Sequence, residues 1–325
     1  MIEIVHPGIL ASIQDLGRPG YRRIGVGLSG AMDELALKVA NIMVGNPSSA
    51  AGIETTLGGF ELRFTRDTSF AVTGADADVT LDGGAIPCWW AQDARAGQVL
   101  KARSPRLGMR TYVAFAGGID VPEVMGSRST DLKGGFGGFA GRALAAGDML
   151  DLHEPADASR LKRGFGLSAR KASLIPIVSE EATAVRMLPA AEWEVFPPLA
   201  REEFLDAHWK VLPDSNRIGY RLDGAALDTG NVKELLSHGI LPGTVQVPPS
   251  GKPVVQLNDA NTCGGYPKLG VVIAADLRKF AQLRLGGLVR FSLVTAGEAV
   301  EALKEQQRVL QQIATQCTLA RRFVQ

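Results

Sequence analysis

The sequence predicts a mainly β protein with a few helices, and three observations support this prediction. Short apolar segments alternate with turns rich in Gly, Pro and Asp along most of the chain. Some of these turns, such as Asp82-Gly83-Gly84, are strong hairpin signals. Many short strands at even spacing are typical of barrels or sandwiches rather than of a parallel sheet. With 325 residues, the chain accommodates one large domain or two medium ones.

One helix interrupts the strands in the first half of the chain. Asp33 is placed to cap it, and Leu35, Val39 and Ile42 form an apolar stripe at helical spacing. Gly45-Asn46-Pro47 then ends it. The strands expected around this helix are 2–5, 10–13, 52–57, 60–64, 69–73, 78–81, 99–102 and 110–114.

The second half of the chain repeats the pattern of short strands. A short helix around Phe280 is expected to be capped by Asp276, and the pattern from Gly297 onward is helical. The strands expected here are 184–188, the region of 211, 220–222, 244–247, 254–257, 270–273 and 288–294.

These elements predict two domains, at 1–155 and 184–296, followed by a C-terminal helix at 297–325. Residues 156–183 change character: basic residues lie among small ones, which favours a solvated linker between domains. Phosphate binding by this basic cluster is the alternative interpretation.

Composition excludes several functional classes. The formal net charge is +1, so no electrostatic attraction to nucleic acid or to an anionic membrane is expected. Cys88, Cys263 and Cys317 are too far apart for a disulfide framework or a CxxC zinc pair, and no motif predicts a metal site. No apolar run approaches the ~20 residues of a membrane span, and the N-terminus lacks signal-peptide features. We therefore expect a cytoplasmic protein.

The most informative segment is 259–268, which lies between two apolar strands. It contains Asp259, the paired glycines Gly264 and Gly265, then Tyr266 and Lys268. Paired glycines allow positive φ and let the backbone approach a ligand closely. This composition favours a binding loop on a rigid scaffold, and the alternative is a Gly-rich turn with incidental polar residues.

Two polar clusters precede the first helix. Gln14, Asp15 and Arg18 surround a Pro-Gly turn, where they could contact a ligand or hold the turn through an Asp15–Arg18 ion pair. Ser29 lies in a Gly-rich loop that leads into the helix. That loop could hold an anion at the helix N-terminus, although capping by Asp33 explains the acid without any ligand.

Further candidates lie in later loops. Arg128 and Ser129 precede the glycine-dense segment 134–141, which could bind an oxygen ligand or serve as a flexible lid. Arg217 flanks a turn into a strand, and Gln246 lies in the segment 243–253. Ser250-Gly251-Lys252 in that segment lacks the spacing of a phosphate-binding loop. Of the four histidines, only His238 is a catalytic candidate, and an ordinary loop histidine is the favoured interpretation. Cys263 could be nucleophilic, but no partnered histidine is visible in the sequence, which favours a small binding-loop residue.

Together, in order, these clusters resemble a known family. The matching stretches span residues 1–296 and read QDLGRPGY, SGAMD, VGNP, IETTLGG, TGAD, FAGGIDVPEVMGSRST, GGFGGFAGRAL, SNRIGYRLDG, GTVQVPPSGKP and GGYPKLGVVIAADL. The family is variously labelled KipA, allophanate hydrolase subunit 2 or the C-type subunit of 5-oxoprolinase, and is biotin-dependent carboxyltransferase-like.

The resemblance implies that 1–155 and 184–296 are cyclophilin-like β-barrels. It implies one component of an ATP-hydrolysing 5-oxoprolinase, inactive alone, which helps open the lactam of 5-oxo-L-proline to L-glutamate. The implied partners are a KipI-type protein, also called the B-type subunit, and an A-type subunit, with ATP and Mg used by the complex. The alternatives are a carboxyltransferase component of a biotin-dependent, urea-carboxylase-like system, and a regulator that binds a KipI-type kinase inhibitor.

Each of these reactions acts on an amide-like substrate, so each needs donors aimed at an oxygen that gains negative charge. We therefore expect catalytic roles for Asp259, Arg128 and Asp15, as donors or as groups that orient a substrate N–H or activate water. The residues expected to bind substrate are Gln14, Arg18, Ser29, Ser129, Arg217, Gln246, Gly264, Gly265, Tyr266 and Lys268.

Overall fold

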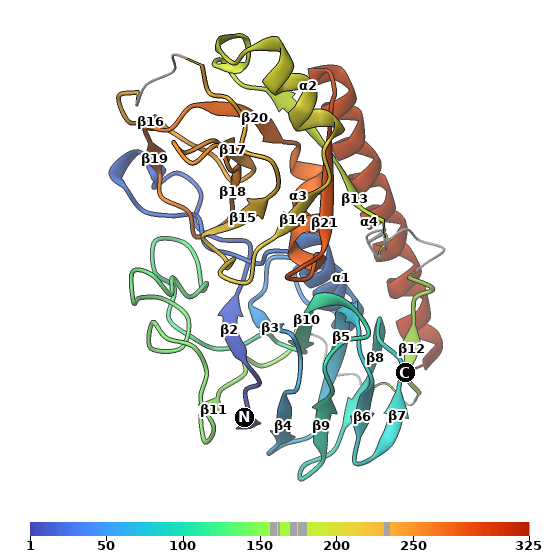
Figure 1. Ribbon diagram of the computed structural model, residues 1–325. Coiled ribbons are helices and arrows are strands. Elements are labelled where there is room, and N and C mark those ends of the chain that lie inside the picture. Colours follow the sequence, from blue (N-terminus) through green and yellow to red (C-terminus); the bar gives the residue numbers. More distant parts are fainter. Residues whose placement is uncertain (157–160, 162, 170–173, 175–180, 231–234, 325) are drawn as a thin grey trace. The chain divides into compact units, whose positions relative to one another are not determined.

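The computed structural model describes residues 1–156, 161, 163–169, 174, 181–230 and 235–324 (Figure 1). The chain divides into two compact units. Unit 1 comprises Met1–Arg18, Ser29–Pro176 and Gln307–Gln325, and unit 2 comprises Pro19–Leu28 and Ile177–Gln306. The excursion at 19–28 and the split of the last helix were not expected. Of the predicted basic linker, residues 157–160, 162, 170–173 and 175–180 lie outside the described residues, and the domain boundaries at 155, 183 and 296 stay a prediction.

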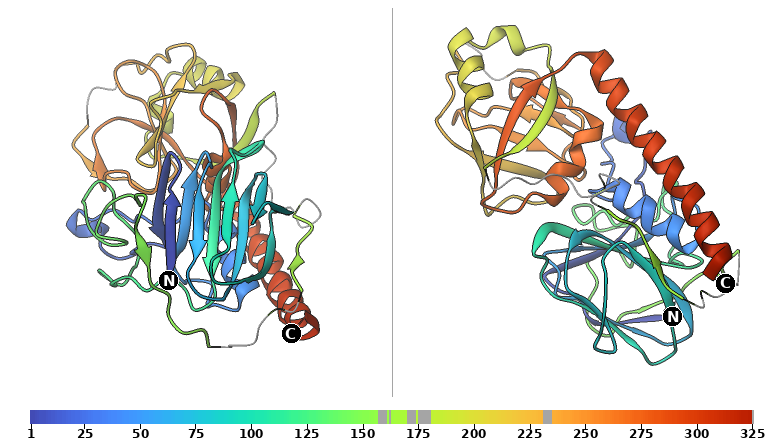
Figure 2. Two further views of the ribbon diagram at one scale, coloured as in Figure 1. Left: turned by 90° about the horizontal axis from the view of Figure 1, so that it is seen from below. Right: turned by 90° about the vertical axis from the view of Figure 1, so that its right-hand side faces the viewer.

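Unit 1 contains two six-stranded sheets within the described residues, where the resemblance implied one barrel (Figure 2). In spatial order, the first sheet consists of β11 (Met149–Leu150), β1 (Ile2–His6), β4 (Glu61–Phe64), β9 (Val99–Ala102), β6 (Val79–Leu81) and β7 (Gly84–Ile86). The second consists of β12 (Phe165–Gly166), β8 (Trp90–Ala94), β5 (Thr68–Asp76), β10 (Leu107–Phe115), β3 (Gly52–Thr56) and β2 (Leu10–Gln14).

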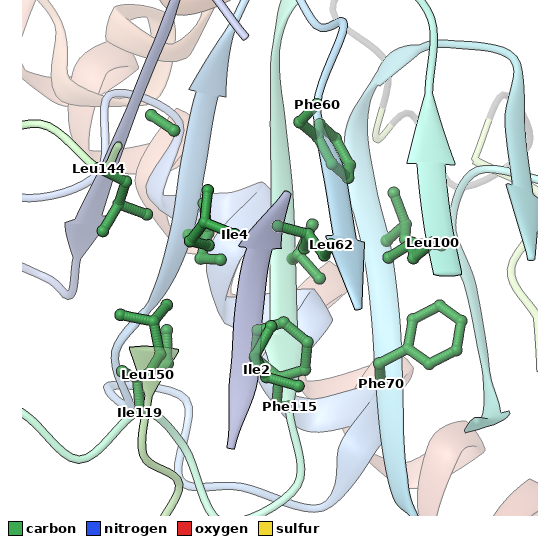
Figure 3. Close-up of a cluster of buried hydrophobic side chains, with 14 of the residues drawn as sticks. Ile2, Ile4, Phe60, Leu62, Phe70, Leu100, Phe115, Ile119, Leu144 and Leu150 are labelled. Atoms are coloured by element: carbon green, nitrogen blue, oxygen red, sulfur yellow. The ribbon is translucent and has the colours of Figure 1, made fainter. Parts of the chain in front are cut away.

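The hydrophobic core of unit 1 lies between these sheets. Burial alternates along β1, where Ile2 and Ile4 face the core, because only one face of this strand is covered. By contrast, the central strands β5 and β10 are buried on both faces. Figure 3 shows part of the core, with Ile2, Ile4, Phe60, Leu62, Phe70, Leu100, Phe115, Ile119, Leu144 and Leu150 labelled.

Helix α1 (Glu34–Val44) covers the outer face of β5 and β10, which explains their continuous burial. As predicted, the Asp33 carboxylate caps the helix by accepting from the Ala36 N–H at 3.2 Å, and Gly45 ends it with φ 82°. Only a residue that tolerates positive φ fits this end without strain.

Helix α4 (Ala296–Val324) is the expected C-terminal helix, and its last part packs in unit 1. Ile313 and Cys317 are buried in the same cluster as α1. The buried Arg321 guanidinium lies against the end of α1 and donates to the Met43 carbonyl at 3.4 Å. A cation at a helix C-terminus is favoured by the helix dipole, so Arg321 joins α4 to α1 by charge as well as packing.

Unit 2 is a closed barrel. In spatial order its strands are β13 (Thr183–Pro189), β20 (Lys268–Val272), β17 (Thr244–Gln246), β18 (Val254–Gln256), β15 (Gly219–Asp223), β14 (Trp209–Val211) and β21 (Leu288–Leu293). The unit also includes α2 (Pro198–Asp206), α3 (Ala274–Gln282) and the short helices η1 (Arg22–Ile24) and η2 (Trp193–Val195). A side ladder pairs β16 (His238–Gly239) with β19 (Cys263–Gly264).

The prediction of a mainly β chain with barrel structure and a C-terminal helix is confirmed. The expected capping of α3 by Asp276 is wrong, because Asp276 lies inside the first turn and accepts two hydrogen bonds from the Arg186 side chain, at 2.7 and 3.0 Å. Burial alone would raise the pKa of Asp276, but hydrogen bonds from Arg186 and Lys279 outweigh it and lower the pKa. Among the described residues, no helix has both the length and the apolar character needed to cross a membrane.

Candidate functional site

Asp15 organises a buried polar network in unit 1. One carboxylate oxygen accepts from the Gly17 N–H and the Ser127 hydroxyl, each at 2.7 Å, and from the Ser129 hydroxyl at 2.5 Å. The other accepts from the Arg128 N–H at 2.5 Å. A carboxylate held by so many donors of its own chain is well suited to fixing loops. This geometry favours a positioning role for Asp15, and its catalytic role stays a prediction.

Arg18 and Gln14 extend this network to the other predicted loops. The fully buried Arg18 guanidinium donates to the Ser29 hydroxyl at 2.8 Å and to the Ser129 carbonyl at 2.5 Å. Arg18 and Asp15 therefore hold Ser129 from its carbonyl and hydroxyl sides. The Gln14 amide donates to the Thr130 carbonyl at 3.2 Å and accepts from the Gly30 N–H at 3.1 Å. The structure thus brings Gln14, Asp15, Arg18, Ser29 and Ser129 together.

In the glycine-dense segment after Arg128, Gly137 is required for steric reasons. A Cβ there would meet the Ser129 carbonyl and would lie 2.9 Å from Nη2 of Arg18. The Arg128 side chain itself is about one-third exposed and pairs with Glu123 at 3.2 Å. Its backbone is therefore part of the buried network, whereas its guanidinium faces a partly solvated acid.

The N-terminus of α1 is occupied by carboxylates of the chain itself. The Asp33 carboxylate accepts a hydrogen bond from the Ala36 N–H. The buried Glu54 carboxylate accepts from the Met32 N–H and from the Tyr112 hydroxyl, each at 2.8 Å. Burial, followed by the charge of Glu54, raises the pKa of Tyr112 well above its ordinary value. This arrangement disfavours the anion site proposed for the helix N-terminus, because a ligand anion would meet two fixed negative charges.

Asp259 and Arg217 form a buried ion pair in unit 2. The Arg217 side chain donates to both Asp259 oxygens, at 2.8 and 3.0 Å, and both side chains are less than 5% exposed. The Asp259 N–H also donates to the Arg217 carbonyl at 3.0 Å. This bidentate contact anchors the start of the 259–268 segment, so the geometry favours a structural role for a residue predicted to be catalytic.

The middle of that segment, Asn261 and 263–266, lines a pocket of about 310 Å³ in unit 2, together with Gln246 and Gln256. Gly264, Gly265 and Tyr266 contribute from the loop. The segment is not a hairpin, because β17 lies between β18 and β20 in the barrel. The structure therefore gathers four predicted substrate-binding residues, Gln246, Gly264, Gly265 and Tyr266, around one polar cavity.

The amide of Gln246 distinguishes this pocket. Gln246 is only 4% exposed, and its Oε1 accepts from Gln256 Nε2 at 2.9 Å, which leaves Nε2 as the remaining hydrogen-bonding group of the amide. Within the described part of the chain, this Nε2 has no hydrogen-bond partner. A Cβ at Gly264 would lie 2.5 Å from it, so only glycine fits beside this donor without displacing it. A buried donor without an acceptor costs about 1–3 kcal/mol, which a ligand oxygen would recover.

Lys268 lies at the end of the same loop and connects the loop to His238 and, through His238, to Glu192. Its ammonium donates to the Gly264 carbonyl at 3.0 Å and lies 3.3 Å from His238 Nδ1. The other ring nitrogen of His238 lies 3.0 Å from Glu192. Burial lowers the pKa of Lys268, and the charge of Glu192 opposes this shift. Glu192 is far from His238 in the chain, so no local signal could have revealed the contact.

A larger cavity, of about 840 Å³, lies in unit 1 along β6 and β7. None of the predicted site residues lines it, and its Arg106 pairs with Asp78 at 3.3 Å. Burial raises the pKa of the Cys88 thiol in its wall to about 11, which makes that thiol unreactive. In the described ranges, no group of His, Cys, Asp and Glu side chains is placed to hold a metal ion.

Comparisons with known proteins agree with this architecture. Residues 24–293 match the family described as carboxyltransferase domain, subdomain A and B. The chain is 42% identical to the C-type subunit of 5-oxoprolinase from Escherichia coli, over 97% of this chain and 98% of that protein. It is 40% identical to the protein of the same name from Haemophilus influenzae, over 96% and 97% of the two chains.

A solved structure places the same fold in a much larger protein. The urea amidolyase of Kluyveromyces lactis superposes with a TM-score of 0.88 at 31% identity, over 96% of this chain but 20% of that one. The urea amidolyase of Saccharomyces cerevisiae is 36% identical over 95% of this chain and 17% of that protein. The chain therefore belongs to the carboxyltransferase domain family, subdomain A and B, which includes the C-type subunits of 5-oxoprolinase.

Proposed function

We propose that this chain is the C-type subunit of an ATP-dependent 5-oxoprolinase, which opens the lactam of 5-oxo-L-proline to L-glutamate. One observation supports this most strongly: the 42% identity to such a protein extends over 97% of this chain and 98% of the relative. The similarity therefore includes every loop described above, rather than the barrel alone.

The chemistry of the pocket in unit 2 suits such a substrate. 5-Oxoproline is a small planar lactam, and its carbonyl oxygen gains negative charge when the ring carbon is attacked. The buried, unpaired Gln246 Nε2 is a donor held in place by Gln256 before any ligand arrives. A preorganised donor of this kind stabilises developing charge without reorganisation. We assign Gln246 this role and give Gly264, Gly265 and Tyr266 the task of shaping the pocket.

The activity in this proposal belongs to a complex with A-type and B-type subunits. The Gly-rich loop before α1 does not fit ATP phosphates, because Glu54 accepts from the Met32 N–H of the loop and Asp33 from the Ala36 N–H of the first helical turn. Nor does Ser250-Gly251-Lys252, since the Lys252 ammonium pairs with Asp223. We therefore place ATP, with Mg, in the complex as a whole rather than at these two loops. The cytoplasm is the compartment in which such a complex would meet its ATP.

A carboxyltransferase role is the second candidate, supported by the family match and the TM-score of 0.88 to a urea amidolyase. Here Gln246 would donate to the oxygen of urea, and biotin would arrive on another protein. The identities to urea amidolyases, 35% and 36%, are lower than those to the 5-oxoprolinase proteins.

Reconstitution tests the proposal directly. The chain is co-expressed with A-type and B-type subunits, and glutamate release from 5-oxoproline is measured with and without ATP. We expect ATP-dependent release from the complete mixture and none when this chain is omitted. Release that is unaffected by the omission would reject the proposal. Carboxylation of urea, with a biotinylated carrier as donor, would favour the second candidate.

A further inference from the structure

Glu192, His238 and Lys268 form a chain of titratable groups beneath the pocket loop, which we call the His238 cluster. His238 lies on β16 and pairs through its backbone with Gly264 on β19. Its Nε2 lies 3.0 Å from a Glu192 oxygen, and its Nδ1 lies 3.3 Å from the Lys268 ammonium. Lys268, 4% exposed, donates at the same time to the Gly264 carbonyl.

The Nδ1 atom of His238 has two neighbours that demand different protonation states. It lies 3.1 Å from the Leu236 carbonyl, to which it can only donate, and 3.3 Å from Lys268, from which it can accept. In the neutral ring, Nε2–H donates to Glu192 and the Nδ1 lone pair accepts from Lys268. In the charged ring, Nδ1–H turns this contact into a donor–donor repulsion and instead satisfies Leu236.

We propose that His238 is a pH-responsive positioning residue: its neutral ring holds Lys268 on the Gly264 carbonyl, and its protonation by solvent releases the pocket loop. Only the consequence for substrate rests on the proposed function, because the loop movement itself requires no ligand. Gly264 lies beside the unpaired Gln246 donor, so release of the loop would disturb the site that the donor serves.

The surroundings of the ring are consistent with such a switch. The charged groups that approach it in the described residues are Glu192, just before η2, and Lys268, on β20. The adjoining β19 faces it with backbone, and the Cys263 thiol of that strand is exposed. The His238 side chain is itself 47% exposed, so solvent protons reach it. Histidine is the side chain that commonly changes charge between pH 5 and 8.

Amide hydrogen exchange at Leu235 and Ile240 measures the loop without any substrate. Their N–H groups donate to the carbonyls of Gly265 and Thr262, at 2.8 and 3.1 Å. Exchange in the wild-type chain is compared with His238→Gln at the same pH, so that the intrinsic pH dependence of exchange cancels. Glutamine can still accept from Lys268 but cannot gain a proton. His208→Gln, at an exposed position of the same unit, is the matched control.

We expect equal exchange at pH 8. At pH 5.5, we expect exchange in the wild type to be up to about tenfold faster than in His238→Gln, since an ordinary histidine is then about 90% charged. His208→Gln should follow the wild type, and Lys268→Met should exchange fast at both pH values. The Val272 amide, which donates to Gly243 in the barrel, should not change in any variant and so reports an intact fold.

A ratio of wild type to His238→Gln that is the same at pH 5.5 and pH 8 would overturn the proposal. Slow exchange in Lys268→Met, with the barrel amide protected, would also overturn it. Because no substrate is present, either result leaves the proposed 5-oxoprolinase function to be judged separately by reconstitution.

Discussion

At the residue scale, the sequence context of three polar side chains does not indicate whether each has a hydrogen-bond partner. Asp15 and Asp259 each lie in a glycine-containing polar segment, as a catalytic acid would, yet donors of the chain hold both carboxylates. Gln246 lies in an ordinary strand pattern, yet it carries the buried, unpaired donor. The sequence predicted where polar groups gather. Their partners lie far away along the chain, so no local pattern could separate a structural network from a ligand site.

The buried pair of Asp259 and Arg217 predicts a large loss of stability when one partner is neutralised. We expect Asp259→Asn to lower the free energy of unfolding of unit 2 by about 3 kcal/mol, because Arg217 would stay buried with its charge uncompensated. This change in the free energy of unfolding is measured by unfolding the chain in urea and monitoring peptides from unit 2 by mass spectrometry.

Asp214→Asn is the matched control. Asp214 pairs with Arg221 at 3.0 Å in the same unit, but both side chains are about 60% exposed. Loss of this exposed ion pair should change the free energy of unfolding by less than about 1 kcal/mol. Equal effects of the two variants would argue against the structural role of Asp259.

At the element scale, strong local signals predicted the structure well. The strands with apolar runs between Gly and Asp turns are present, and α1 starts and ends as its cap residues indicate. Short strands such as β16 and β19, with two residues each, have too little pattern to predict. The sequence analysis also missed α2, whose apolar positions are few. Helix α4 packs against α1 in unit 1. Hydrophobic periodicity along α4 cannot reveal which element the helix packs against.

The packing of α4 makes its own prediction. Ile313 is 3% exposed and lies in the α1 cluster, so Ile313→Ala should destabilise unit 1 by about 3 kcal/mol through the cavity it leaves. Leu319→Ala removes an apolar side chain that is 49% exposed on the same helix and should have little effect. The unfolding of β5 and β10, monitored through peptides from these strands, measures the difference in stability between the two variants. An Ile313→Ala chain with wild-type stability would show that α4 does not support unit 1.

At the scale of the whole molecule, each unit has its own group of predicted site residues. In unit 1 they form a hydrogen-bonded network around Asp15, and in unit 2 they surround a pocket beside a buried, unpaired donor. No single motif identified the family, but several stretches in order along the chain did, and the full-length identity of 42% agrees with them. That agreement gives the fold and the family. Which polar group meets the substrate follows only from burial and hydrogen bonding.

The kinetics of Gln246→Met in the reconstituted complex test the central claim most directly. Methionine keeps the size of the side chain but removes the donor, so we expect kcat/KM for 5-oxoproline to fall at least about tenfold, the value of one hydrogen bond. The stability of the free chain should change little, because loss of the unpaired buried donor offsets loss of the hydrogen bond from Gln256. Gln282→Met, at a buried glutamine of α3 outside the pocket, should leave kcat/KM unchanged. Wild-type kcat/KM in Gln246→Met would contradict the assignment of this pocket.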